Sequence, residues 1–139
     1  MKLRHLFLFC VICCSVSIFA QNKSKLPKTS GNPIFEGWYA DPEGIVFGDE
    51  YWIYPTYSAP YDDQIFMDAF SSKDMVHWTK HPKVLSVENI KWLEFALWAP
   101  AVIHANDKYY FFFGANDIQN NNELGGIGVA VADNPAGPF

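Results

Sequence analysis

Residues 38–56 read WYADPEGIVFGDEYWIYPT, and residues 96–114 repeat their pattern as ALWAPAVIHANDKYYFFFG. The prolines, turn aspartates and following tyrosines align at a spacing of 58 residues: Pro42 with Pro100, Asp49 with Asp107, and Tyr51 with Tyr109. A repeat explains such shared residues as architecture. It does not explain Asp41, because Ala99 stands at the matching place in the second copy.

Short runs of aromatic and β-branched residues alternate with turn residues at about ten-residue intervals, which is typical of β-strands. The first copy predicts strands over residues 44–47, 51–56, 65–70 and 79–85, and the second over 101–105, 109–113 and 127–131. Gly48-Asp49 and Asn106-Asp107 predict hairpin turns. Farther along, the spacing becomes 61 residues, with Trp78 on Phe139, so an insertion is expected in a loop such as 116–126.

A repeat of about sixty residues with four short antiparallel strands is the pattern of a β-propeller blade, which buries its faces by stacking on neighbouring blades. Two blades do not close a ring. The sequence therefore predicts an all-β chain that forms the first two blades of a longer protein. The second blade should expose an apolar face that a third blade would cover.

The first twenty residues have the layout of a signal peptide, since Lys2 and Arg4 precede an apolar run over residues 6–19 that ends in Ala20. A cleaved signal at 1–20 is favoured over a membrane anchor because the run is short and polar residues follow it. Residues 21–33 are expected to be a linker and residues 34–139 the propeller portion. Export predicts a secreted or periplasmic protein without stable membrane association after cleavage.

All three cysteines lie within that segment at positions 10, 13 and 14, so the mature chain would have no disulfide and no thiolate metal site. A lipid-modified cysteine is disfavoured because no small residue precedes Cys13 or Cys14 in the usual way. The formal net charge is −5, and removal of Lys2 and Arg4 makes it more negative, which argues against a nucleic-acid partner. An aromatic share of 17% suits either a sugar-binding surface or a β-rich core of large side chains.

Asp41 is expected just before the innermost strand of the first blade, where residues from several blades converge on one rim. Trp38 and Tyr39 would wall a pocket beside it. The alternative is an aspartate that caps a turn next to Pro42. The alanine at the matching place in the second copy favours function.

The motifs that carry a family resemblance occur in series: ADPE (40–43), GDEYWIYPT (48–56), DAFSSKDMVHW (68–78), LWAPAV (97–102), NDKYYFFFGAND (106–117) and GIGVAVADNPAGPF (126–139). In this order and spacing the chain resembles the start of a family 43 glycoside hydrolase over residues 31–139. The resemblance implies a five-bladed propeller that cleaves glycosidic bonds of arabinose- or xylose-containing plant polysaccharides with inversion.

Asp41 matches the general base of that family. The resemblance places the general acid, a glutamate, and an aspartate that tunes it on later blades, so this chain alone should be inactive. Trp98 would stack on a sugar ring or pack between blades. In many family members an acidic residue follows the WAP sequence, where this chain has Ala101. A carbohydrate substrate is thus the expected partner, and a sugar-binding propeller without catalysis is the alternative.

Other polar residues are assigned architectural roles. Asp62, Asp63 and Asp68 follow the second predicted strand and could reach the rim of the pocket, but a solvated acidic loop is the favoured interpretation. His77 and His81 lack the surroundings of a metal pair, so no metal site and no cofactor are expected. The resemblance allows a calcium ion in the propeller channel, held by a histidine of a later blade, but no residue of this chain indicates it.

Overall fold

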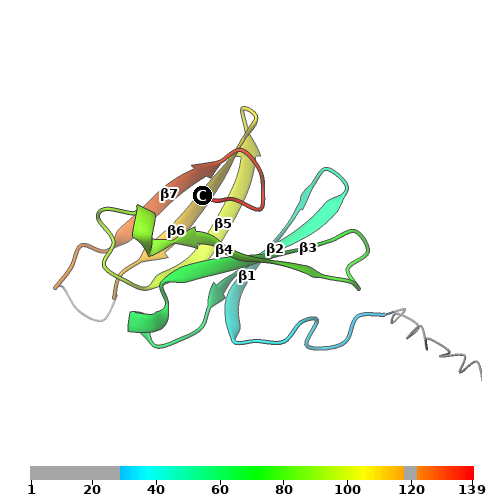
Figure 1. Ribbon diagram of the computed structural model, residues 1–139, viewed down its shortest axis with the longest axis horizontal. Coiled ribbons are helices and arrows are strands. Elements are labelled where there is room, and N and C mark those ends of the chain that lie inside the picture. Colours follow the sequence, from blue (N-terminus) through cyan, green and yellow to red (C-terminus); the bar gives the residue numbers. More distant parts are fainter. Residues whose placement is uncertain (1–28, 118–121) are drawn as a thin grey trace, which may run out of the picture.

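The computed structural model describes residues 29–117 and 122–139 as two antiparallel sheets (Figure 1). The first sheet contains, in spatial order, β1 (Tyr39–Phe47), β2 (Glu50–Tyr57), β3 (Phe66–Ser72) and β4 (Thr79–Ser86). The second contains β5 (Leu97–Ala105), β6 (Lys108–Ala115) and β7 (Gly126–Ala132). Two short 3-10 helices, η1 (Tyr61–Asp63) and η2 (Val87–Asn89), lie in the connections. The predicted signal peptide and most of the predicted linker lie outside the described residues.

The all-β prediction and the strand order are confirmed, but β1 and β5 begin earlier than predicted. Both strands continue past their prolines because a β-bulge accommodates them. In the first sheet Ala40 pairs with Thr56 and Glu43 with Tyr54, which leaves Asp41 and Pro42 without regular partners. Proline has no N–H to donate to a ladder, so a bulge is a place where a strand tolerates it.

The second sheet repeats this bulge at the matching place. Trp98 pairs with Gly114 and Ala101 with Phe112, so the irregularity falls on Ala99 and Pro100. Asp41 and Ala99 share a left-handed backbone, with φ of 44° and 46°. The repeat frame predicted from the sequence is therefore present in three dimensions. The prediction of four strands per copy holds for the first sheet, whereas the second has three in the described part of the chain.

The hydrophobic core lies between the two sheets. Successive side chains of a strand point to opposite faces, so alternate residues of β2 and β6 meet there. Trp52 and Tyr54 of β2 and Phe111 and Phe113 of β6 are all buried in one cluster. The Tyr54 and Phe111 rings pack edge to face, with centroids 5.6 Å apart, a favourable aromatic arrangement.

Polar contacts from the first sheet and from the connection after η1 satisfy the edge of β5 that has no strand beside it among the described residues. The Gln64 carbonyl accepts the Leu97 N–H at 2.8 Å, and the Gln64 amide donates to the Leu97 carbonyl at 2.7 Å. The Glu43 carboxylate accepts the Val102 N–H. Buried backbone groups need such partners, so these contacts fix the second sheet against the first.

The chain after β7 returns to the first sheet. The Phe139 N–H donates to the Val84 carbonyl at 2.8 Å, and the Tyr54 hydroxyl donates to the Pro135 carbonyl at 2.8 Å. In Figure 1 this segment, drawn in red, turns back from the end of β7. Among the described residues, no helix is long and apolar enough to cross a membrane.

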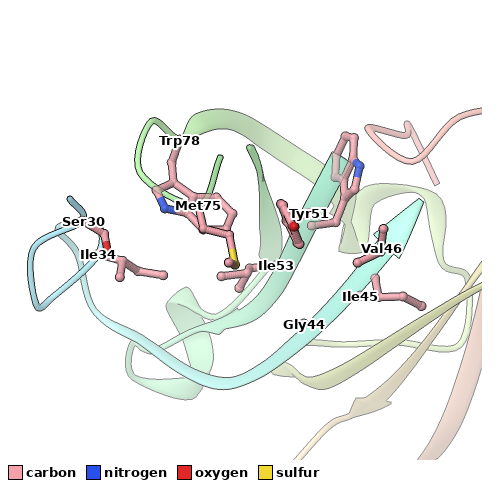
Figure 2. A pocket seen from close by; sticks show the side chains of 10 residues that line it. Ser30, Ile34, Gly44, Ile45, Val46, Tyr51, Ile53, Met75 and Trp78 are labelled. Atoms are coloured by element: carbon pink, nitrogen blue, oxygen red, sulfur yellow. The ribbon is translucent and has the colours of Figure 1, made fainter. Parts of the chain in front are cut away.

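The outer faces of the pair of sheets carry uncovered apolar side chains. On β7, Ile127, Val129 and Val131 point the same way and are 75%, 55% and 49% exposed. The predicted apolar face of the second blade is thus confirmed. On the first sheet, a groove of about 470 Å³ runs over the opposite face, between Val46, Tyr51 and Met75 (Figure 2).

Candidate functional site

Asp41 lies within β1, at the bulge, rather than just before the strand as predicted. A bulge bends the strand and re-aims the side chain of its extra residue. The Asp41 side chain is exposed, and its Oδ2 accepts a hydrogen bond from the Thr56 hydroxyl at 3.0 Å. Within residues 29–117 and 122–139 the other oxygen, Oδ1, has no hydrogen-bond partner. One oxygen is therefore anchored and the other is available to a ligand.

Thr56 connects Asp41 to the second sheet. Its hydroxyl oxygen accepts the Ala99 N–H at 2.8 Å, so the two bulge positions are joined through one side chain. Thr56 is 3% exposed. Sequence reasoning missed this residue. The available signal was the repeat itself, because Gly114 stands where Thr56 does in the first copy.

Trp98 lies beside Gly114 on the second sheet. A Cβ at Gly114 would stand 2.5 Å from the indole ring, so only glycine leaves room for the tryptophan in this position. The indole N–H donates to the Asn116 carbonyl at 3.2 Å. The ring is half-buried, so it is held by packing on one side while part of it remains accessible.

Trp38 and Tyr39 differ in how firmly they are held. Trp38 is 82% exposed, and its carbonyl accepts the Ser58 N–H at 2.9 Å. The Tyr39 hydroxyl is engaged within the first sheet, since it donates to Asp68 at 2.8 Å and accepts from Lys80 at 3.0 Å. The aromatic side chain that stands free beside the Asp41 strand is therefore that of Trp38.

Asp68 contradicts the interpretation of an acidic solvated loop. It is 1% exposed and sits at an irregularity of the β3 and β4 pairing. Its carboxylate accepts the Lys83 N–H at 2.9 Å and forms an ion pair with Lys80 at 2.8 Å. The strand register turned it inward, where these donors replace water. Asp62 and Asp63, by contrast, are exposed in η1 as predicted.

These contacts shift two pKa values in the same cluster. Burial raises the pKa of the Tyr39 phenol, and the Asp68 carboxylate acts in the same direction. The hydrogen bond to Asp68 raises the pKa of the Lys80 ammonium. Lys80 is therefore charged and Tyr39 neutral at physiological pH, which suits a structural ion pair.

The groove in Figure 2 is separate from Asp41. Its walls come from β1 and β2, from the turn before β4 and from residues 30–34 ahead of β1, and almost all of its lining is apolar. None of Asp41, Thr56 and Trp98 lines it. A groove without convergent polar groups offers no chemistry, so the bulge at Asp41 is the better candidate site.

The two histidines singled out in the sequence have separate protein partners. The His77 imidazole pairs with Asp74 at 2.7 Å, whereas the His81 imidazole bonds the Ser71 hydroxyl at 2.9 Å and stacks on Trp52. In the part of the chain that the structure describes, no group of three or more His, Cys, Asp or Glu side chains could hold a metal ion.

Comparison with known proteins points to one family. The family model of the glycosyl hydrolases family 43 matches residues 30–139. A β-D-galactofuranosidase of Aspergillus niger is 47% identical over 122 residues, which cover 79% of this chain and 34% of that protein. A xylosidase/arabinosidase of Bacteroides ovatus is 34% identical over 128 residues, which cover 81% of this chain and 38% of that protein.

Solved structures agree with this result. The GH43_1 enzyme from Xanthomonas citri, complexed with xylotriose, superposes with a TM-score of 0.66 at 29% identity, and the match covers 76% of this chain and 32% of that one. The two sheets therefore have the arrangement of two propeller blades. The chain spans about a third of the length of the curated relatives it matches.

Proposed function

Because the chain belongs to glycosyl hydrolase family 43, we propose that it supplies the first two blades and the general base of an inverting glycosidase. The observation that carries this proposal is the environment of the Asp41 side chain. Its carboxylate is accessible, is anchored through one oxygen by Thr56, and stands at a bulge whose counterpart in the second sheet has alanine. A purely architectural residue would have no reason to differ between two copies of the same bulge.

Inversion requires two carboxyl groups on opposite faces of the sugar. A base takes a proton from the attacking water while an acid protonates the leaving oxygen, with the two groups roughly 6.5 to 9.5 Å apart to leave room for the water. Asp41 acts as the base, since Oδ1 accepts the proton of the water while Oδ2 stays bound to Thr56. The acid and the residue that tunes it are assigned to later blades of the full-length protein.

The substrate class follows from the relatives. Their names include xylosidase, arabinosidase and galactofuranosidase activities, and one solved relative was complexed with xylotriose. We assign the full-length protein to the O-glycosyl bonds of arabinose- or xylose-containing polysaccharides and oligosaccharides. The 47% identity to a galactofuranosidase adds galactofuranosides as a second candidate substrate. Trp38 and Trp98 are the proposed stacking surfaces, with Tyr39 supporting the wall of the pocket.

The test is hydrolysis of aryl arabinofuranosides, xylopyranosides and galactofuranosides by the full-length protein. Asp41→Ala should lower kcat by about a hundredfold or more, because general-base catalysis contributes at least that much. The matched control is Asp62→Ala, which removes an exposed carboxylate in η1 and should leave the rate unchanged. A rate for Asp41→Ala within a few-fold of the wild type would refute the assignment of the base.

A sugar-binding propeller without catalysis is the competing function. It would keep the aromatic surfaces and bind the same sugars. Isothermal titration with xylo- and arabino-oligosaccharides separates the two cases, because binding with no hydrolysis of any of the aryl glycosides by the wild type would favour the binder.

We also propose that the protein is exported, on the basis of Lys2, Arg4 and the apolar run at residues 6–19. N-terminal sequencing of the mature protein checks this proposal. The mature protein should be found in the secreted or periplasmic fraction and should begin after Ala20, and a chain that keeps Met1 and stays in the cytoplasm would contradict the proposal.

A further inference from the structure

We propose that Thr56 is a positioning residue for Asp41, and that it ties the base to the second blade through the Ala99 N–H. This inference rests on the proposed function of Asp41 as general base. Thr56 lies on β2 directly opposite Ala40, the neighbour of Asp41. Its hydroxyl contacts the Asp41 carboxylate at 3.0 Å and the Ala99 amide at 2.8 Å. Thr56 and Ala99 are 43 residues apart in the sequence.

The direction of the two hydrogen bonds is set by chemistry. A backbone N–H can only donate, so the Ala99 amide occupies a lone pair of the Thr56 oxygen. A carboxylate can only accept, so the single hydroxyl proton points to Asp41 Oδ2. The hydroxyl thus holds one orientation, and the bond to a charged acceptor is of the stronger kind.

The surroundings of Thr56 keep that orientation. The side chain is 3% exposed, so water does not compete for its hydroxyl. A β-branched residue has a restricted χ1, which limits the positions of the oxygen. On the other side, Ala99 is held in the left-handed conformation before Pro100, so its N–H is a fixed donor.

The consequence concerns how Asp41 presents its free oxygen. With Oδ2 bound to Thr56, rotation of the carboxyl is restrained and Oδ1 stays directed toward the site of the water. A misplacement of about 1 Å in a catalytic group costs about a hundredfold in rate. Thr56 therefore acts on the reaction through Asp41 without touching the substrate.

The experiment compares Thr56→Val, Thr56→Ser and Asp41→Ala in the full-length protein. Valine keeps the shape and removes the hydroxyl, so kcat should fall about 10- to 100-fold while KM stays within about twofold. Serine keeps the hydroxyl and should stay within about threefold of the wild type in kcat. Thr79→Val, the same substitution at an exposed position of β4, is the control and should change neither constant.

A double variant separates positioning from general loss of structure. If Thr56 acts only through Asp41, then Thr56→Val added to Asp41→Ala lowers the residual rate no further. Should Thr56→Val fail to fold, Thr56→Ala replaces it, because the smaller side chain leaves space for a water to bond the Ala99 amide.

The rates of these variants distinguish a failure of the role of Thr56 from a failure of the role of Asp41. If Asp41→Ala abolishes hydrolysis while Thr56→Val keeps its kcat, the role of Thr56 is refuted and the base stands. Equal losses in the valine and serine variants would also refute it, since the hydroxyl would then not be the cause. If Asp41→Ala retains its rate, both proposals fail.

Discussion

At the scale of single residues, two carboxylates that look alike in the sequence have opposite environments. Asp41 is exposed and bound through one oxygen, whereas Asp68 is buried and bound through both. Because Asp68 is 1% exposed, its carboxylate does not meet the water from which a general base would take a proton. Asp68 instead joins β3 to Tyr39 of β1 and to Lys80 of β4.

The Asp68 cluster should contribute to stability rather than to catalysis. Asp68→Ala is expected to lower the free energy of unfolding by about 2 to 3 kcal/mol, because it leaves the Lys83 N–H without its acceptor and breaks two further bonds. Thermal or denaturant unfolding of the full-length protein measures the change. Asp63→Ala, at an exposed position, should stay within about 0.5 kcal/mol of the wild type. Equal stability of the two variants would show that the cluster is not needed.

At the scale of elements, β5 is held by side chains rather than by a neighbouring strand on its inner edge. Gln64, Thr56 and Glu43 bond the N–H or carbonyl groups of Leu97, Ala99 and Val102 in turn. Thr56 and Glu43 lie on strands of the first sheet and Gln64 in the connection after η1, so the position of the second blade depends on polar groups, of which Glu43 can ionise.

Glu43 makes this contact dependent on pH. Burial raises the pKa of its carboxyl, and the Val102 N–H opposes the shift. Because the pKa of this carboxyl is higher in the folded than in the unfolded chain, the contribution of Glu43 to stability is fully present below the unfolded pKa, about 4.5. That contribution is lost as the pH rises through the pKa of the folded state. The side chain of the Glu43→Gln variant cannot ionise. The melting temperature of this variant relative to that of the wild type should therefore increase from about pH 4 to about pH 7.

Melting curves of the full-length protein at several pH values test this expectation. Glu36→Gln removes an exposed carboxylate and serves as the control. A difference between Glu43→Gln and the wild type that is constant with pH would contradict the prediction.

At the scale of the whole molecule, the two-sheet unit carries apolar surface at both ends. Ile127, Val129 and Val131 lie exposed on the outer face of β7. The groove between Val46, Tyr51 and Met75 lies on the outer face of the first sheet (Figure 2). In a propeller such faces are covered by the preceding and following blades, since each blade buries itself against its neighbours. The family assignment places these two blades in such a ring.

The 139-residue chain by itself should therefore be poorly stable and should associate with itself. Size-exclusion chromatography with light scattering is expected to show oligomers, and no hydrolysis is expected. Replacing Ile127 and Val129 by lysine should increase the share of monomer in this chain, because it adds charge to the exposed face. A cooperative thermal transition of a monomeric wild-type chain would contradict the prediction.

Sequence alone was sufficient for the parts of the protein that depend on neighbours along the chain. Strand alternation, the hairpin turns and the repeated proline frame are local patterns, and they align Asp41 with Ala99 without any knowledge of the fold. The same frame carried the family resemblance. The bulge was not predicted. Pro42 indicated where regular pairing fails, but not that strand pairing continues on its N-terminal side, through Tyr39 and Ala40.

The tertiary structure alone decided which side chains meet. Thr56 and Ala99 are 43 residues apart, and Asp68 and Tyr39 are 29 apart. The first contact depends on how the two sheets pack and the second on the register of the strands within the first sheet, and no periodicity within one strand encodes either. For the same reason the burial of Asp68 was misjudged. By its sequence Asp41 is the residue that differs between two copies of a repeat, and by the packing of the sheets it is a carboxylate with one oxygen held and one free.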